Sequence, residues 1–294
     1  MPSLSNVERE TVEQRLAEIS VAYLSDLPAG IADAIGYGLK SPGKRIRPLL
    51  LLYAYRAAGG SRDASMLACA PEVIHAYSLL HDDLPCMDDD DMRRGRPTVH
   101  KVYGSRTAIV AGVAMIPVAA MVIRDAARTM GLSGETRDEI LRTLFEAAGI
   151  GGMIGGQARD LSGEGLSLSL QHLEGIHQAK TGALIVASLR MGALAANATP
   201  ETLAAFQRYG IAIGLAFQIM DDVLDVTSTT SALGKTSGRD IELGKSTYPG
   251  LLGVDGARKR AQALVDDGLE ALRTENILTR ELSEVANFIV TRTS

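Results

Sequence analysis

The first stretch of this sequence suited to chemistry is a dense run of aspartates. Between His81 and Pro97, six carboxylates fall within ten positions (Asp82, Asp83 and Asp88 to Asp91), and Arg93, Arg94 and Arg96 follow. Carboxylates this close together repel one another unless cations neutralise them. Oxygen donors suit hard divalent cations such as Mg²⁺, and the planar donors of arginine match phosphate oxygens. The stretch therefore indicates a site for a metal ion and a phosphate, with a solvated acidic loop as the alternative.

A second acidic cluster lies far downstream and bears on the choice between a metal site and a solvated loop. The apolar run that begins at Gly214 ends in Asp221, Asp222 and Asp225. On a helix, Asp221 and Asp225 share a face, whereas Asp222 points about 100° away from them. Two acidic clusters, each mounted on an otherwise apolar helix, favour a functional site over a solvated loop.

Composition narrows the class of protein. The chain has 294 residues, of which 46% are hydrophobic and only 4% aromatic, without tryptophan, so aliphatic side chains and alanine must fill a sizeable core. The net charge of −5 and the lack of a basic face with aromatics argue against nucleic acid as a partner. The two cysteines, Cys69 and Cys86, do not suggest a disulfide framework and fit a reducing cytosol.

No segment of the sequence is predicted to target or insert into a membrane. Residues 1–10 are polar and acidic, without the basic and then apolar pattern of a signal peptide. The most apolar stretch, Ala108 to Ile123, contains Gly112 and Pro117, and we expect it to fall short of a membrane span. We therefore expect a soluble, cytoplasmic protein.

Apolar residues recur at helical spacing along nearly the whole chain, and no alternating strand pattern is found. The predicted helices are Val7–Leu24, Ile31–Leu39, Leu49–Ala58, Asp63–Leu80, Ser105–Met130 with a kink at Pro117, Glu135–Gly149, Leu168–Ala196 as one or two helices, Glu201–Asp225, Ala257–Arg273 and Arg280–Thr291. Residues Ser228 to Lys245 form a polar loop. We predict an all-α fold, one domain over residues 1–294, whose long helices surround a central cavity.

Two local features bear on this architecture. Pro85 lacks a backbone donor and must distort a helix that passes through it, which would let Asp82 and Asp88 turn toward one metal ion. The glycine-rich stretch 149–157 has neither dinucleotide-binding nor P-loop spacing, so we interpret it as a close approach between helices or between a helix and a ligand.

The ordered motifs resemble those of a known family. Asp82-Asp83 with Asp88, followed by Arg93-Arg94-Gly95, and Asp221-Asp222-x-x-Asp225 resemble the two aspartate-rich motifs of the trans-polyprenyl diphosphate synthases. The resemblance extends from Gly38–Pro48 to Leu243–Pro249 and is strongest to short-chain bacterial farnesyl diphosphate synthases and to geranylgeranyl diphosphate synthases. It implies the isoprenoid synthase-like fold and a prenyltransferase that condenses isopentenyl diphosphate head-to-tail with dimethylallyl or geranyl diphosphate.

The resemblance also implies roles for individual residues. Asp82, Asp88 and Asp221 would bind Mg²⁺, with Asp83, Asp222 and Asp225 close by. Arg93, Lys180, Lys245 and Lys235 would hold the allylic diphosphate; Lys44, Arg47, His75 and Arg94 would bind isopentenyl diphosphate; Thr181 and Gln218 would line the path of the carbocation. Taken singly, these residues have ordinary explanations, such as a basic helix start for Lys44 and Arg47, a core histidine for His75 and a helix-end lysine for Lys180.

Product length is expected to depend on the residues just before Asp82. Tyr77 lies five residues earlier, about 7.5 Å down a helix, and Ser78 lies four earlier. In the family a bulky residue at the first position forms a floor under the growing chain. Tyr77 therefore favours the fifteen-carbon product over the twenty-carbon one, although it could also be a packed core tyrosine.

The family pattern also has one departure and one implication for assembly. Where the family usually has Gly-Asp-Ala-Leu, this chain has Gly112-Val113-Ala114-Met115, so an aspartate is missing. Family members form homodimers through apolar helices, and Ala108 to Ile123 is the candidate surface. Three other functions were weighed: a non-catalytic partner subunit, which would be expected to have lost a motif; a terpene cyclase, which commonly replaces the second motif; and a cation-binding protein, which leaves the lysines and arginines unexplained.

Overall fold

The computed structural model describes residues 6–227 and 246–292, and within them the chain is almost wholly helical. The α-helices are α1 (Asn6–Ala22), α2 (Ala29–Leu39), α3 (Ile46–Ala57), α4 (Ser65–Asp82), α5 (Val99–Tyr103), α6 (Ser105–Met130), α7 (Gly134–Ala148), α8 (Met153–Ser162), α9 (Leu170–His177), α10 (Ala183–Ala195), α11 (Pro200–Thr227), α14 (Tyr248–Thr274) and α15 (Arg280–Thr291). A π-helical turn, η1 (Gln178–Gly182), joins α9 to α10. The all-α prediction is confirmed.

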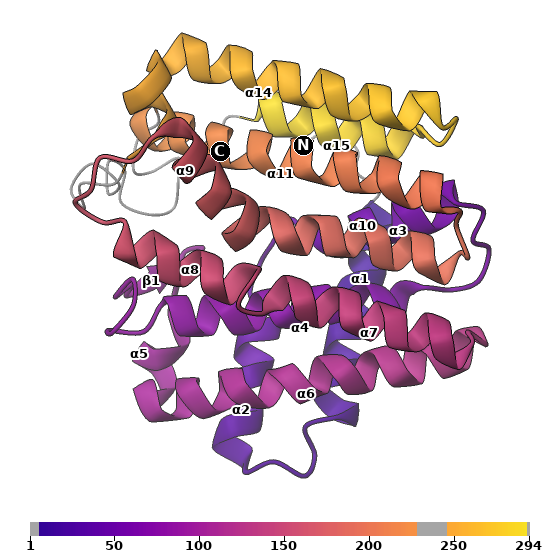
Figure 1. The fold of residues 1–294 in the computed structure, drawn as a ribbon. Coiled ribbons are helices and arrows are strands. Elements are labelled where there is room, and N and C mark those ends of the chain that lie inside the picture. Colours follow the sequence, from indigo (N-terminus) through magenta and orange to yellow (C-terminus); the bar gives the residue numbers. More distant parts are fainter. Residues whose placement is uncertain (1–5, 228–245, 293–294) are drawn as a thin grey trace.

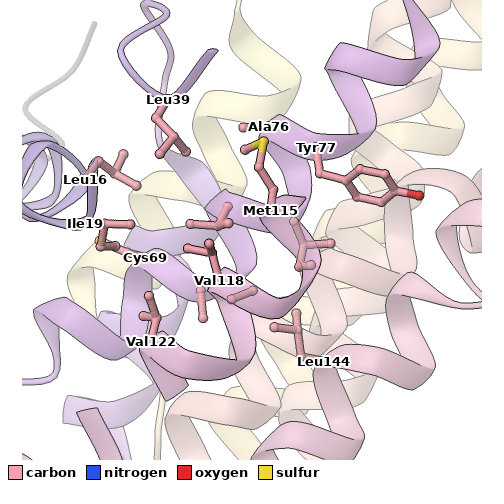
Figure 2. Close-up of a cluster of buried hydrophobic side chains, with 14 of the residues drawn as sticks. Leu16, Ile19, Leu39, Cys69, Ala76, Tyr77, Met115, Val118, Val122 and Leu144 are labelled. Carbon is pink, nitrogen blue, oxygen red and sulfur yellow. The ribbon is translucent and has the colours of Figure 1, made fainter. Parts of the chain in front are cut away.

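The helices pack around two clusters of buried side chains (Figure 1). The first is built mainly on α1, α2, α4 and α6, and Figure 2 shows part of it around Cys69, Met115 and Val122. The second is built mainly on α10, α11, α14 and α15. Helix α3 contributes Leu51 to the first cluster and Leu50 to the second. The first aspartate cluster follows α4 and the second lies on α11, so each cluster of carboxylates rests on a different part of the core.

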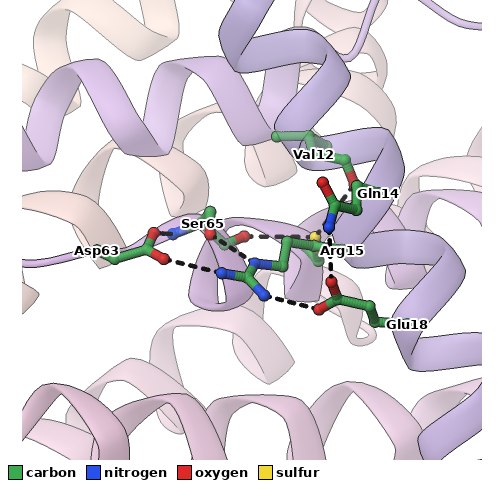
Figure 3. Close-up of polar contacts among 7 residues, drawn as sticks. Val12, Gln14, Arg15, Glu18, Asp63 and Ser65 are labelled. Atoms are coloured by element: carbon green, nitrogen blue, oxygen red, sulfur yellow. Dashed lines mark hydrogen bonds and ion pairs between the residues drawn. The ribbon is translucent and has the colours of Figure 1, made fainter.

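Polar contacts fix several helix ends. Ser133, Ser169, Thr247 and Thr279 each cap the N-terminus of the helix that follows, because their side-chain oxygens accept a backbone N–H of the first turn. Helix α1 is held against the start of α4 by Arg15, which donates to Ser65 and Asp63 at 3.0 Å and to Glu18 at 2.7 Å (Figure 3). Both cysteines are free, as predicted.

Helix α6 has the predicted bounds, Ser105–Met130. It runs unbroken for 26 residues with Pro117 inside. Among the described helices it is the one that is long and apolar enough to cross a membrane, where we expected the stretch to fall short of a span, and 44% of its most apolar window is buried inside the protein. At Gly112 an added Cβ would lie 2.2 Å from Nε2 of His81 on α4, so a larger residue there would displace the His81 ring. The two longest helices of the first cluster therefore approach closely at this glycine.

Three other sequence predictions are corrected. A short antiparallel hairpin, β1 (Met92–Arg93) and β2 (Arg96–Pro97), is present where no strand was expected. It closes through Arg94 and Gly95, whose φ values of 54° and 75° are those required by the tight turns of such hairpins.

The other two corrections concern helix boundaries. Helix α4 ends at Asp82, before Pro85, rather than continuing distorted through it. The penultimate helix begins at Tyr248, not at Ala257, and is broken only at Gly253, where φ is 70°. The predicted loop Ser228–Lys245 lies outside the described residues.

Candidate functional site

The first aspartate cluster is arranged by the turn that follows α4. Asp88 donates its backbone N–H to the carbonyl of Asp82 at 2.8 Å, so the chain folds back over the end of the helix. Burial raises the pKa of Asp82 to about 7; the Lys180 ammonium opposes the rise and the Asp88 carboxylate adds to it. The turn after α4, and not a distorted helix, therefore brings the charges of Asp82 and Asp88 together.

The hairpin after this turn supplies arginines to the same region. Arg93 donates to Asp83, which is 5% exposed, and reaches Asp90 at 3.2 Å. Arg94 donates to the carbonyl of Pro42 at 2.6 Å, in the segment before α3. Asp83 is thus held by an arginine in this structure, while Arg94 faces the basic segment that precedes α3.

The π-helical turn η1 lies between the two aspartate clusters. Its Lys180 forms an ion pair with Asp160 on α8 at 2.6 Å, and its Thr181 donates to Gln218 on α11 at 3.0 Å. On α8, Gln157 donates to Asp88 at 3.3 Å. These contacts connect the first cluster to α8, α8 to η1, and η1 to the helix that carries the second cluster.

Two glycines allow this close packing around η1. A Cβ on Gly156 of α8 would lie 2.3 Å from the backbone nitrogen of Lys180, and one on Gly214 of α11 would lie 3.0 Å from the Cα of Gly182. The interpretation of the glycine-rich stretch as a close helix approach is therefore confirmed for Gly156. A π-helical turn is uncommon and is frequently found at functional sites.

The three aspartates of the second cluster have different surroundings. Asp221 is 40% exposed and pairs with Arg292, just after α15, at 2.8 Å. Asp222 is buried and accepts the backbone N–H of Tyr248 at 3.0 Å, so it supports the start of α14. Asp225 is 4% exposed, and neither of its carboxylate oxygens has a hydrogen-bond partner among the described residues. A buried, unpartnered carboxylate is costly unless a cation satisfies it.

Four predicted residues form a second, cationic region. Burial lowers the pKa of Arg47 to about 10, so it stays charged at neutral pH. Burial lowers the pKa of His75 well below its usual value, and the positive charges of Arg47 and Arg94 lower it further, so this histidine is neutral. Burial also lowers the pKa of Lys44, and Arg292, Asp221 and Arg94 lie close enough to act on it. A small cavity of about 30 Å³ is lined in part by His75 and Arg94.

Underneath this region lies an ion pair that the sequence did not single out. Arg45, at φ 51°, donates to Glu72 at 2.7 Å and to the carbonyls of Leu39 and Ser41 at 3.0 and 2.8 Å. Glu72 lies on α4, one turn before His75, and its charge also acts on Arg47 and Arg94. Arg45 thus fixes the start of α3, and Glu72 places a negative charge among the cations.

The chain-length candidates lie on α4. Tyr77 is 8% exposed, and its ring meets that of His81 edge-on, with centroids 4.9 Å apart. In Figure 2 the Tyr77 ring points away from Ile19 and Cys69 on the other side of the cluster. Ser78 donates to the carbonyl of His75 at 2.9 Å. The large ring is thus held in one orientation, whereas Ser78 is bound back to its own helix.

Lys235 and Lys245 lie outside the described residues. Asp89 and Asp91 lie instead with His100, with ligand atoms within 4.8 Å of one another, but Asp91 is paired with Lys101 at 2.7 Å. That group is distinct from the predicted set of Asp82, Asp88 and Asp221.

Comparisons with known proteins identify the family of this chain. The polyprenyl synthetase family model matches residues 28–282. The chain is 45% identical over 267 residues to the farnesyl diphosphate synthase of Escherichia coli K12, covering 89% of each chain, and 43% identical over 267 residues to the geranylgeranyl diphosphate synthase of Cyanophora paradoxa, covering 90% of this chain and 88% of that one.

A solved structure shows the same fold over the whole length. The geranyltransferase of Helicobacter pylori, complexed with magnesium and isoprenyl diphosphate, has a TM-score of 0.82 and 32% identity, with 99% of this chain and 97% of that chain covered. This chain belongs to the polyprenyl synthetase family. The resemblance that the aspartate motifs indicated is therefore confirmed. Because curated relatives include both fifteen- and twenty-carbon synthases, membership of the family does not by itself select a product.

Sequence reasoning missed Glu72, Gln157, Asp160 and Arg292 as residues of this polyprenyl synthetase site. Glu72 carried a weak signal, because it is a lone charge on an apolar helix. Gln157 and Asp160 follow the glycine-rich stretch, whose role as a helix contact was predicted without its polar partners. Arg292 carried no signal, because its partner on α11 lies 71 residues earlier.

Proposed function

We propose that this protein is a short-chain trans-prenyltransferase that joins isopentenyl diphosphate to dimethylallyl or geranyl diphosphate and makes mainly farnesyl diphosphate. One observation carries the proposal: a continuous series of polar contacts links Asp88 to Gln157, Asp160 to Lys180, and Thr181 to Gln218, one turn before Asp221. This series places cationic and polar side chains between two acidic clusters that lie 139 residues apart in sequence. Relatives named as farnesyl and geranylgeranyl diphosphate synthases support it.

The donor set fits magnesium. The candidate ligands Asp82, Asp88 and Asp221 offer only oxygen, which Mg²⁺ prefers. The buried Asp225 has two carboxylate oxygens without partners among the described residues, as expected where a cation is to be held. Bound Mg²⁺ would supply positive charge that offsets the charge of the diphosphate and of the leaving group.

The proposed reaction proceeds by ionisation and addition. The allylic C–O bond breaks and its electron pair leaves with the diphosphate, which gives an allylic cation. The double bond of isopentenyl diphosphate then donates its electron pair to this cation and forms the new C–C bond. A base, for which the departed diphosphate is available, then removes a proton. The electron pair of the broken C–H bond becomes the new double bond. The product is again an allylic diphosphate, one five-carbon unit longer.

The protein's own residues bind and orient the two substrates. Lys180 and Arg93, beside the first aspartate cluster, provide donors for the allylic diphosphate. Thr181 and Gln218, joined at 3.0 Å, present oxygen dipoles toward the space between the clusters, where they stabilise developing positive charge. Arg47 and Arg94, together with Lys44 and the neutral His75, form the cationic region for isopentenyl diphosphate.

Product length is assigned to Tyr77, with geranylgeranyl diphosphate as the alternative product. The ring is buried and is held edge-on against His81. A rigid aromatic at this depth of α4 blocks a hydrocarbon chain that grows away from Asp82. The fifteen-carbon product follows from this block.

We also propose that the enzyme is a soluble, cytoplasmic homodimer that pairs through α6. The side chains of Ile109, Val110 and Val113 are 43%, 42% and 55% exposed and lie on one face of that helix. Val113, where the family usually has aspartate, thus enlarges an apolar surface and does not point into the core. Val110→Glu should shift the protein toward monomer in sedimentation, whereas Val21→Glu, at an exposed valine on α1, should not.

One assay tests the catalytic proposal. Purified protein is incubated with Mg²⁺, isopentenyl diphosphate and dimethylallyl or geranyl diphosphate, and product length is read by mass spectrometry. Farnesyl diphosphate is expected; release of a hydrocarbon would indicate a cyclase, and the absence of any product would contradict catalysis. Asp82→Asn should lower kcat roughly 10²–10³-fold, a loss typical of removing one preorganised electrostatic contact, while Asp267→Asn, at an exposed aspartate on α14, should not change it.

A further inference from the structure

The guanidinium of Arg292 is fixed at the edge of the second aspartate cluster. Its side chain is 3% exposed. Nη2 lies 2.8 Å from Oδ1 of Asp221 and 2.7 Å from the carbonyl oxygen of Phe217, and the guanidinium carbon lies 4.0 Å from the centroid of the Phe217 ring. Three contacts on one helix, α11, therefore hold this side chain in a single orientation.

The same turn of α15 also reaches the cationic region. Arg292 donates its backbone N–H to Phe288 at 3.0 Å, one turn earlier, and the Phe288 ring lies under Lys44, with 5.3 Å from Nζ to the ring centroid. The end of α15 thus contacts both a proposed magnesium ligand, Asp221, and a residue assigned to isopentenyl diphosphate, Lys44. Neither contact follows from the aspartate motifs.

We propose that Arg292 is a positioning residue for Asp221. This inference rests on the proposed function, in which Asp221 is a magnesium ligand. A carboxylate that binds a metal ion through one oxygen is commonly oriented by a hydrogen bond to the other. Arg292 pairs with Oδ1 at 2.8 Å, and the Asp221 side chain remains 40% exposed, which leaves room for a metal ion at its second oxygen.

A positioning role and a purely electrostatic role predict opposite results. A fixed positive charge beside Asp221 weakens the attraction of that carboxylate for Mg²⁺, so an arginine that acted only as a charge would lower metal affinity. Its removal would then make Mg²⁺ bind more tightly. If Arg292 orients the carboxylate, its removal makes Mg²⁺ bind less tightly, because Asp221 is free to turn away.

The experiment compares Arg292→Ala, Arg292→Lys and Arg280→Ala. Arg280 is at the start of α15, the helix that Arg292 follows, and is 79% exposed in a surface pair with Glu284, so it is a matched control. Calorimetry measures the binding of inorganic pyrophosphate at a series of Mg²⁺ concentrations, which does not depend on turnover. Elongation assays on the same proteins measure the Mg²⁺ concentration for half-maximal rate and the KM for isopentenyl diphosphate.

Arg292→Ala should raise the Mg²⁺ concentration for half-maximal binding 10- to 100-fold, the range found when an outer partner of a metal ligand is removed. Arg292→Lys should lie between Arg292→Ala and the native protein, because its single ammonium cannot reproduce the planar guanidinium contacts. An unchanged or lowered Mg²⁺ requirement in Arg292→Ala would overturn the positioning role while leaving the enzyme assignment intact. Failure of the native protein to bind pyrophosphate with Mg²⁺ would overturn both. Should Arg292→Ala fail to fold, the Arg292→Lys result decides in the same way.

Discussion

Arg45 and Glu72 form an ion pair of 2.7 Å between Nη1 and Oε1, in which each side chain is only 5% exposed. The pair joins the start of α3 to the middle of α4, directly beneath the proposed isopentenyl diphosphate site. Removing one partner of a buried pair typically costs about 3–5 kcal/mol, because the other charge is left without compensation. Here Arg45 keeps two carbonyl acceptors, which reduces that cost.

Glu72→Gln should therefore lower the free energy of unfolding by about 2–3 kcal/mol, which is at or just below the lower end of that range. It should also lower the KM for isopentenyl diphosphate more than the KM for the allylic substrate, because the loss of a negative charge beside Arg47 and Arg94 strengthens their attraction for the diphosphate. Urea unfolding and steady-state kinetics measure the two effects. A loss of stability below about 0.5 kcal/mol, the range of ordinary surface substitutions, would show that the pair does not hold α3 in place.

Tyr77→Ala should lengthen the product from fifteen to twenty carbons or more, because the floor of the proposed tunnel is removed. The variant should also be less stable by about 3–5 kcal/mol, as for other large aromatic truncations in a core. Mass spectrometry of the products gives the length, and Tyr77→Phe is the control that keeps the ring and should keep the product. An unchanged product from a folded Tyr77→Ala protein would assign Tyr77 to the core alone.

His75 should be neutral in the free protein at pH 7 and below, because burial and the surrounding arginines lower its pKa. Isopentenyl diphosphate adds negative charge nearby, which favours the protonated ring and so raises this pKa. Binding should therefore take up a proton at pH values between the free and bound pKa. Imidazole NMR titrations with and without the ligand measure both values, and His75→Gln identifies the signal. The exposed His172 is the internal control, and a His75 signal that the ligand leaves unmoved would place the site elsewhere.

Gly156→Ala should disturb η1, since the new Cβ would lie 2.3 Å from the nitrogen and 2.6 Å from the Cα of Lys180. Backbone at that distance cannot move as a flexible side chain does, so a loss of about 1–3 kcal/mol is expected, as for other overpacked sites. The rate should fall as well, because Lys180 and Thr181 are displaced. Gly151→Ala is the matched control, because a Cβ there meets nothing within 4 Å. Equal rates for the two variants would show that the approach of α8 to η1 is not needed for activity.

The sequence predicted the features that depend on local periodicity and composition. Helical spacing was enough for the all-α fold, and the ordered motifs between Gly38–Pro48 and Leu243–Pro249, with the two acidic clusters among them, were enough for the family. The roles of the individual site residues stay predictions, apart from the contacts described above. These contacts show that carboxylates neighbouring in sequence have different partners, since Asp221 pairs with Arg292 whereas Asp222 accepts from Tyr248.

What the sequence could not predict depends on contacts between distant segments. The partner of Asp222 lies 26 residues later and that of Asp221 lies 71 residues later, so neither follows from helix periodicity. Pro85 correctly marked a break after the first aspartates, but whether α4 bends or stops there depends on how the following turn bonds back to Asp82. The hairpin was missed because its turn places an arginine, Arg94, at positive φ, where glycine or asparagine is the usual signal.

Because η1 is a π-helical turn, the number of residues between α9 and α10 matters as much as the side chains that those residues carry. A π turn accommodates one more residue than an α-helical turn. Deleting any single residue from 178 to 182 would allow a regular α-helical turn to form, and the wider turn that carries Lys180 and Thr181 would be lost. Lys180 and Thr181 could then no longer face α8 and α11 together. Substitutions of residues 178 to 182 should therefore be tolerated better than deletions of a single residue from the same stretch.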